Sequence, residues 1–362
     1  MSAPLLQITD FHLGFRTRRG TVQAVDGVDL VVNEGETVGL VGESGCGKSA
    51  TVRSILRLLP DKVARYGPGE IRLNDRNVLD LPEAEMRRIQ GGDVAMVFQD
   101  PMTSLNPVMT VGDQITEYLA AHTDLDRAAM RARVIELLSM VGIPVPEERM
   151  TWFPHQLSGG MRQRVMIAMA LSCEPRLLLA DEITTALDVT LQAQILDLLH
   201  ALSERLNTAT LLITHDLSVV AGMTRRVYVM YAGQIIEEAE TDALFAAPAM
   251  PYTWGLLRSA PSLDAPLTED LTPIEGLPPD LAAPPPGCRF ASRCPYRREI
   301  CQSRMPDLRA APDGGTHRVR CWGAQDVPEG GWLIGTDWRE DTGDPRIVAD
   351  IRAASAMAGT ES

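Results

Sequence analysis

The sequence predicts an α/β fold built around a mostly parallel β-sheet, and two features of the chain support this prediction. From residue 5 to about residue 236, short apolar runs alternate with segments of helical periodicity. The apolar runs are continuous, which is typical of strands that are buried on both faces of a parallel sheet. We therefore expect strands at residues 37–41, 94–98, 177–180 and 211–214.

Helical periodicity predicts two further elements. A helix is expected from about residue 191 to residue 206, with leucine and isoleucine on its inner side. Between residues 110 and 142 the pattern is also helical, which predicts a helical insert in the α/β domain. The residues that share one face of this insert are Met130, Val134, Leu137, Leu138 and Val141.

Length and composition limit the class of protein. A chain of 362 residues is long enough for one large and one small domain, and 45% hydrophobic content is typical of globular proteins. No apolar stretch reaches the length of a membrane span, and the first ten residues do not resemble a signal peptide, so we expect a cytosolic location. The net charge of −14 argues against a protein that coats nucleic acid.

The composition changes near Pro261. Residues 273–286 are rich in proline, which predicts a linker over about 261–287. A group of cysteines follows within residues 288–323, where we expect a small separate domain. The tail at residues 324–362 has no clear period and no assigned role.

A glycine-rich segment lies between the strand at 37–41 and a helical pattern that begins at about Ala50. Its glycines allow successive backbone N–H groups to point at one anion. A lysine there supplies charge to the β- and γ-phosphates of a nucleotide, and the following serine hydroxyl can hold Mg²⁺. The segment therefore predicts a nucleotide site, and its residues are Gly42, Glu43, Ser44, Gly45, Cys46, Gly47, Lys48, Ser49 and Ala50.

Polar residues at the ends of other predicted strands complete this site. Asp181 ends one strand and can hold the hydrated Mg²⁺ opposite the serine of the loop. Glu182 follows and can polarise an attacking water. Gln99 ends a second strand and its amide can contact Mg²⁺ or its water, and His215 ends a third strand, where its imidazole can bond the γ-phosphate.

A second anion site is expected at residues 157–160. Ser158 is a suitable N-cap for the helix that continues to about residue 165, and two glycines leave N–H groups open at the positive end of the helix dipole. The four residues of this segment are Leu157, Ser158, Gly159 and Gly160.

In order and spacing, these motifs resemble those of the ATP-binding subunits of ABC transporters, over about residues 5–260. The resemblance implies an ABC-type P-loop ATPase domain at residues 1–260, with a RecA-like core, a helical insert at about 100–175 and a β subdomain. It also implies catalytic roles for Glu182 and His215 and an aromatic contact of Phe15 with adenine. Residues 157–160 would act as the signature on the partner's ATP, and the D-loop would be Ala186, Leu187 and Asp188.

Finer features are similar to the ATPases of dipeptide and oligopeptide importers. They include residues 99–107, His155-Gln156, residues 251–257 and the late cysteines. Nickel importers share some of these features, so the substrate stays open. The resemblance implies a second ATPase subunit, which in this subfamily is a related but different chain, two transmembrane permease subunits and, indirectly, an extracytoplasmic binding protein. It also implies that this chain lies at the cytoplasmic face of the membrane. ATP would be held between the phosphate loop of one subunit and the signature of the other.

The sequence departs from the family pattern at Ile183, where proline is usual. Loss of the fixed φ of proline can loosen this turn, but Glu182 is present and we expect hydrolytic activity. Cys46 is compatible with the loop, because that position contributes mainly backbone.

The four late cysteines lack the paired C-x2-C spacing of most zinc sites. Eight arginines surround them in an otherwise acidic chain, and these could offset the charge of a [4Fe–4S] cluster or meet anionic lipid headgroups. The importer resemblance implies a [4Fe–4S] cluster, with a structural role. Zinc, with His317 as a further ligand, and plain thiols or disulfides are the alternatives. The expected ligands are Cys288, Cys294, Cys301 and Cys321.

Two other classes of protein are alternatives to a transport ATPase. A soluble ABC ATPase that acts on DNA or ribosomes would usually have a long coiled-coil insertion or two nucleotide domains, and this chain has one phosphate loop and a short insert. The other is a redox or metal sensor that also binds ATP. The transport ATPase, with ATP and Mg²⁺, is the favoured prediction.

Overall fold

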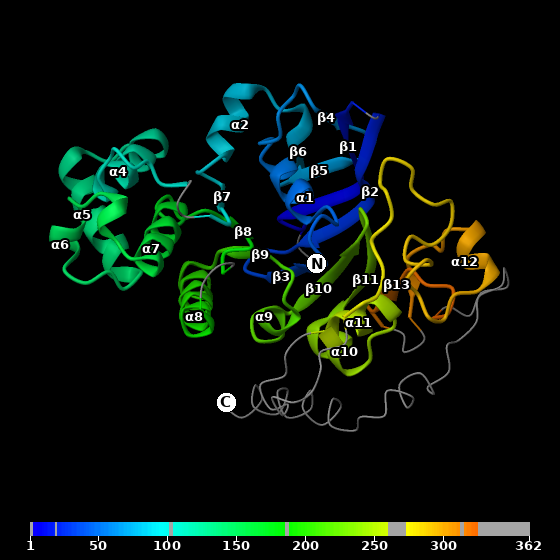
Figure 1. The fold of residues 1–362 in the computed structure, drawn as a ribbon. Helices are drawn as coiled ribbons and strands as arrows, with labels where there is room; N and C mark the ends of the chain where they lie inside the picture. Colours follow the sequence, from blue (N-terminus) through cyan, green and yellow to red (C-terminus); the bar gives the residue numbers. More distant parts are fainter. Residues whose placement is uncertain are drawn as a thin grey trace.

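The computed structural model describes residues 3–18, 20–100, 104–184, 188–259, 273–311 and 315–324. Its main sheet has eight strands in the order β12-β13-β11-β10-β3-β9-β8-β7 (Figure 1). These strands are β3 (Thr37–Val41), β7 (Val94–Val97), β8 (Leu177–Asp181), β9 (Ala209–Thr214), β10 (Arg226–Tyr231), β11 (Gln234–Glu240), β12 (Arg309–Ala310) and β13 (Arg318–Val319).

The central strands of this sheet confirm the predicted parallel α/β core. β10, β3, β9, β8 and β7 are parallel neighbours, whereas β11, β13 and β12 pair antiparallel at one edge. Every residue of β8 and β9 is buried, which explains their continuous apolar sequences. Because parallel strands end at the same edge, Asp181 and His215 are brought to one side of the sheet.

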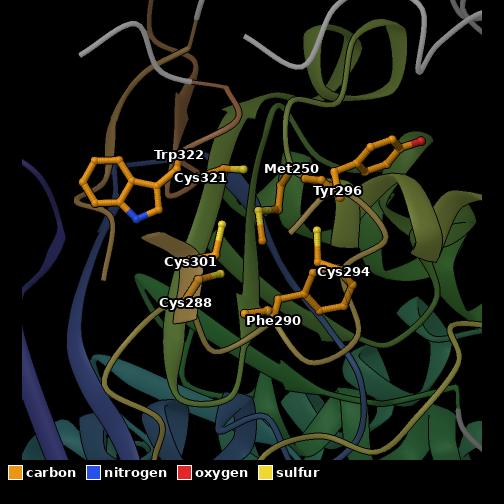
Figure 2. A pocket seen from close by; sticks show the side chains of 10 residues that line it. Met250, Cys288, Phe290, Cys294, Tyr296, Cys301, Cys321 and Trp322 are labelled. Atoms are coloured by element: carbon orange, nitrogen blue, oxygen red, sulfur yellow. The ribbon is translucent and has the colours of Figure 1, made fainter. Parts of the chain in front are cut away.

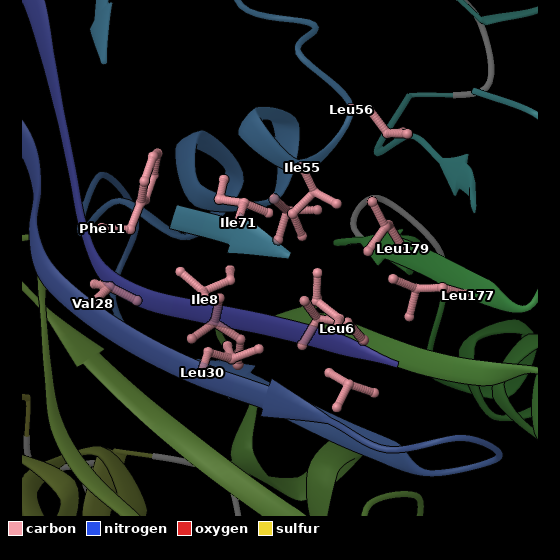
Figure 3. Packing of buried hydrophobic residues seen from close by; sticks show 14 of the residues in the cluster. Leu6, Ile8, Phe11, Val28, Leu30, Ile55, Leu56, Ile71, Leu177 and Leu179 are labelled. Carbon is pink, nitrogen blue, oxygen red and sulfur yellow. The ribbon is translucent and has the colours of Figure 1, made fainter. Parts of the chain in front are cut away.

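A second, antiparallel sheet packs beside the first. It consists of β1 (Leu6–Thr17), β2 (Gly20–Val32), β4 (Ala64–Tyr66), β5 (Glu70–Leu73) and β6 (Arg76–Asn77). Apolar side chains of β1 and β2 share one hydrophobic cluster with α1 (Lys48–Ile55) and β8, as Figure 3 shows for Ile8, Leu30, Ile55 and Leu179. This cluster fixes the start of α1, and hence the phosphate loop, against both sheets.

The helical insert lies to the side of the sheets in Figure 1. The predicted helical insert over residues 110–142 contains two helices, because the chain turns between residues 123 and 126 and Asp126 caps the second one. The helix predicted over residues 191–206 is α8. The helices are α2 (Glu83–Ile89), α4 (Val111–His122), α5 (Arg127–Met140), α6 (Pro146–Arg149), α7 (Gly159–Ala170), α8 (Val189–Leu206), α9 (Leu217–Ala221), α10 (Thr241–Ala246), α11 (Pro251–Ser259) and α12 (Glu299–Ser303), with 3-10 turns at Val78–Asp80 and Pro154–Gln156.

The cysteine-containing segment packs directly on the α/β core. Its strand β13 pairs with β11, and its residues Phe290 and Val319 share a hydrophobic cluster with Val41 and Tyr252. The proline-rich residues before it follow β2, where the backbone N–H of Gln23 donates to the carbonyl of Leu281 (2.9 Å). In Figure 1 this yellow segment runs beside β2 toward α12. A division into linker and separate domain stays a prediction.

None of the helices in the described part of the chain combines the length and the apolar character needed to cross a bilayer.

Candidate functional site

The phosphate loop connects β3 to α1, and its glycines hold backbone conformations that other residues rarely adopt. Gly42 has φ of 152° and Gly47 has φ of 113°. A Cβ atom on Gly42 would lie 2.1 Å from the carbonyl oxygen of Met230, and one on Gly47 would lie 2.5 Å from that of Ala24. The loop is therefore pressed against β10 and β2, and only glycine fits at these two positions.

Lys48 is buried within the loop, with its side chain 3% exposed. Its ammonium donates to the carbonyl oxygens of Gly42 (2.6 Å) and Glu43 (3.1 Å) and lies 3.7 Å from the Glu182 carboxylate. These contacts hold a positive charge at the mouth of the loop. The Lys48 ammonium is therefore already oriented before a phosphate binds.

Ser49 and Asp181 meet at the end of β8. The Ser49 hydroxyl donates to Asp181 Oδ1 (2.8 Å), and Arg53 approaches Asp181 Oδ2 at 3.5 Å. Burial raises the pKa of Asp181, although the contacts with Ser49 and Arg53 oppose this shift. Hydroxyl and carboxylate oxygens are donors that Mg²⁺ prefers, so this pair fits the predicted cation. Arg53 was not singled out from the sequence.

Glu182 lies at the centre of the predicted catalytic group. Its φ is 49°, a left-handed conformation that directs the side chain back toward the loop. Gln99 donates to Glu182 Oε2 (3.0 Å), and His215 Nδ1 lies 3.7 Å from the same oxygen. The structure thus brings together Gln99, Lys48, Glu182 and His215 from separate parts of the sequence. A carboxylate held this way can orient a water next to a phosphate bound at Lys48.

Phe15 lies near the end of β1, opposite Val22 of β2 and Ala64 of β4. Its ring is half-buried and packs against the first hydrophobic cluster. A contact with adenine stays a prediction.

The second predicted anion site is on α7, in the helical insert. Ser158 is its N-cap, and its hydroxyl accepts from the backbone N–H of Met161 (3.3 Å). Gly160 is buried, and a Cβ there would lie 2.8 Å from the side chain of Leu191, whereas Gly159 is exposed with open space around it. The capping role of Ser158 is confirmed, and its role toward a partner's nucleotide stays a prediction.

Two residues of the predicted D-loop, Ala186 and Leu187, lie outside the described residues. The third, Asp188, is the N-cap of α8 and accepts from the backbone N–H of Leu191 (2.9 Å). Ile183 is buried, and its carbonyl accepts from Gln163 (2.8 Å), so this turn is held by α7 without a proline.

All four late cysteines line one apolar pocket. Figure 2 shows their sulfur atoms around a shared space that Met250 also borders, with Phe290 and Trp322 on its walls. All six cysteines of the chain are free thiols, so the disulfide alternative is wrong for this structure. Burial raises the pKa of Cys288 to about 11 and that of Cys294 to about 12. Without a metal these two thiols therefore keep their protons at neutral pH.

The thiols are not arranged as a finished metal site. Within the described ranges, no group of three or more histidine, cysteine, aspartate or glutamate side chains is placed to hold a metal ion. His317, the further ligand in the zinc alternative, is not among the pocket residues and contacts Glu237 (2.8 Å) instead. Four thiols in one apolar pocket nevertheless form a donor set that suits an iron–sulfur cluster.

Two of the surrounding arginines, Arg289 and Arg293, form ion pairs that the sequence did not indicate. Arg289 pairs with Asp26, and Nη1 and Nη2 of Arg293 donate to the two oxygens of the Glu43 carboxylate (2.7 and 2.9 Å). Tyr252, on α11, accepts from the backbone N–H of Glu43 (2.8 Å). The Arg293–Glu43 pair joins the cysteine segment to the phosphate loop across 250 residues that no local pattern could connect, whereas Arg289 joins the segment to β2.

Comparison with known proteins identifies two matching families. Residues 25–185 match the ABC transporter family, and residues 236–301 match the C-terminal region of oligopeptide/dipeptide transporters. The chain is 51% identical over 318 residues to the dipeptide transport ATP-binding protein DppD of Bacillus subtilis (strain 168), which covers 88% of this chain and 94% of that protein. It is 49% identical to the oligopeptide transport ATP-binding protein OppD of the same strain, with 88% of each chain covered.

Among solved structures, the fold resembles a dimeric ATP-binding cassette bound to ADP and Pi in a post-hydrolysis state. The two chains are 28% identical with a TM-score of 0.58, and the likeness covers 65% of this chain and 98% of the cassette.

Proposed function

Because this chain belongs to the ATP-binding proteins of ABC transporters, in the group of the dipeptide and oligopeptide transport proteins, it is an ATP-hydrolysing transport subunit, and we propose that it energises the import of peptides. The observation that carries the ATPase assignment is the group formed by Lys48, Ser49, Asp181 and Glu182 at the end of β8. The peptide assignment is supported by the names of the relatives and by the C-terminal region match.

In the proposed reaction, the phosphate loop binds the phosphates and Lys48 contacts the β- and γ-phosphates. Glu182 orients the attacking water and accepts its proton, while His215 donates a hydrogen bond to the γ-phosphate. Mg²⁺, held through Ser49, Asp181 and the amide oxygen of Gln99, would neutralise phosphate charge when bound. Phe15 would contact the adenine ring.

We propose that the ATP is enclosed by a second subunit. The γ-phosphate would bridge this chain's phosphate loop and the partner's signature segment, and residues 157–160 here would do the same for the partner's ATP. Hydrolysis removes the bridge and allows the pair to open. Support for a pair comes from the solved cassette, which is a dimer.

Transport subunits of this family work with permease and substrate-binding partners. For this chain we propose a related but non-identical second ATPase, two transmembrane permeases and an extracytoplasmic binding protein. The chain would lie at the cytoplasmic face of the membrane as a peripheral subunit. A nickel or other small-solute importer is the second candidate, because nickel importers share some of the sequence features quoted above.

We further propose that Cys288, Cys294, Cys301 and Cys321 hold a [4Fe–4S] cluster with a structural role. Support comes from the shared apolar pocket, which protects a cluster from solvent. Side-chain rotation would be needed to bring the sulfurs into ligating positions. Iron and sulfide assays with a visible spectrum, on chain purified without oxygen, test this: colourless protein with stoichiometric zinc would establish the zinc alternative.

The transport proposal is tested in the reconstituted complex. ATP hydrolysis should rise when the binding protein is loaded with peptide, and not when it is empty or supplied with nickel. A complex with Lys48→Ala is the control for hydrolysis that depends on this chain. Stimulation by nickel and by no peptide would assign the chain to the second candidate.

A further inference from the structure

The phosphate loop is held from the side of the cysteine segment as well as from the sheets. Glu43 is the residue where these supports meet. Its carbonyl accepts from Lys48 (3.1 Å), its backbone N–H donates to the Tyr252 hydroxyl (2.8 Å), and its carboxylate accepts from Nη1 and Nη2 of Arg293. A displacement of Glu43 therefore changes a contact of the lysine that binds the phosphates.

The Arg293 side chain is held in place by several contacts besides Glu43. Its side chain is only 4% exposed. Besides Glu43, it donates to the carbonyl oxygens of Ile274 and Glu275 (both 3.0 Å) in the proline-rich segment, and it lies over the rings of Tyr231 and Phe290. A guanidinium bound to both carboxylate oxygens is restricted in direction as well as distance. The Glu43 carboxylate thus cannot move independently of Arg293.

Arg293 also adjoins the thiol pocket. Cys294 is the next residue, and the backbone N–H of Arg293 donates to the carbonyl of Phe290 (3.0 Å) in a turn that forms the pocket wall. The Phe290 ring contacts Tyr231 and Tyr252, with both centroid distances 5.4 Å. A change at the thiols that moves this turn therefore also moves Arg293. Through the contact of Phe290 with Tyr252, it reaches Glu43 by a second route.

We propose that Arg293 is a positioning residue for the phosphate loop and that it couples changes at the thiols of the pocket to the affinity for nucleotide. The proposal goes beyond the transport function, because it concerns how strongly the chain holds nucleotide and not what is carried. A coupling between two sites is reciprocal, so nucleotide must influence the thiols as much as the thiols influence nucleotide. This reciprocity distinguishes coupling from an ion pair that merely attaches one segment to another.

The first test measures equilibrium binding of ATP to the full chain in EDTA, where hydrolysis does not occur. Arg293→Met should weaken binding by about 5- to 30-fold, within the usual range of couplings, and Arg293→Lys should lie between the two. Glu43→Gln should match Arg293→Met, and the double variant should be no worse than either single one. The matched control is Arg297→Met, an exposed arginine of the same segment whose side chain donates to the carbonyl of Ser292 (3.4 Å) and does not reach Glu43.

The second test measures the rate at which N-ethylmaleimide labels Cys294 in the chelator-treated chain, followed by mass spectrometry. Saturating ATP should change this rate in the wild type and leave it unchanged in Arg293→Met and Glu43→Gln. If Arg293→Met does not fold, Glu43→Gln removes the pair from the loop side. Unchanged ATP affinity in the folded variants, or ATP binding that leaves the wild-type labelling rate unaffected, would overturn the proposal.

Discussion

Replacement of Glu182 by glutamine separates two effects of its charge. In the structure the Glu182 carboxylate lies 3.7 Å from the Lys48 ammonium. Two unit charges at this distance interact by about 4 kcal/mol at an effective dielectric of about 20. Because Lys48 would also contact the γ-phosphate, the carboxylate and the phosphate would both lie beside the same ammonium and repel each other.

Solvent and the bound cation screen most of this repulsion, and we expect about 1–2 kcal/mol to remain. Glu182→Gln should therefore bind ATP about 5- to 30-fold more tightly. Turnover should fall by about 100- to 10,000-fold, because the amide cannot accept the proton of the attacking water. The assay is ATP hydrolysis and retention of radiolabelled ATP in the reconstituted complex.

Glu182→Asp is the matched variant, since it keeps the charge and withdraws the carboxylate by one methylene. It should lose turnover without gaining ATP affinity. Unchanged hydrolysis in Glu182→Gln, or weaker ATP binding than in the wild type, would refute the reasoning.

Three further substitutions test the phosphate loop and two hydrogen-bonded carboxylates. Gly47→Ala should lower the free energy of unfolding by about 2–4 kcal/mol and abolish ATP binding, because the φ of 113° and the nearby Ala24 carbonyl exclude a Cβ atom. The control Gly222→Ala, with no atom near its Cβ position, should leave stability and ATP binding unchanged. Glu237→Gln should cost about 2–4 kcal/mol in urea unfolding, because the fully buried side chain accepts from two backbone N–H groups and from a histidine; an equal loss in Glu238→Gln would contradict this. Burial alone would raise the pKa of Glu36, but hydrogen bonds from Arg226 and Asn33 hold this pKa below 4.5. The ionised Glu36 side chain therefore stabilises the fold above pH 4.5, and this contribution is lost as pH falls through the lowered pKa. The unfolding free energy of Glu36→Gln, followed from neutral pH into acid, should therefore decline less than that of the wild type.

Much of the fold follows from local patterns. The strands at 37–41, 177–180 and 211–214 were predicted within a few residues of their observed bounds, because continuous apolar runs are compatible with few other environments. The helical pattern over residues 110–142 did not locate the break between α4 and α5, because Asp126 acts as an N-cap only through its own turn and does not interrupt the apolar period.

The sequence alone determined the phosphate loop, the carboxylates at the end of β8 and the cap of α7, because neighbouring residues and backbone sterics specify each of them. The tertiary structure decided which distant groups meet. It placed Gln99 on Glu182, directed His317 to Glu237 and away from the thiols, and paired Arg293 with Glu43. Such contacts join residues that are adjacent only after the strands have paired, so no spacing along the chain encodes them.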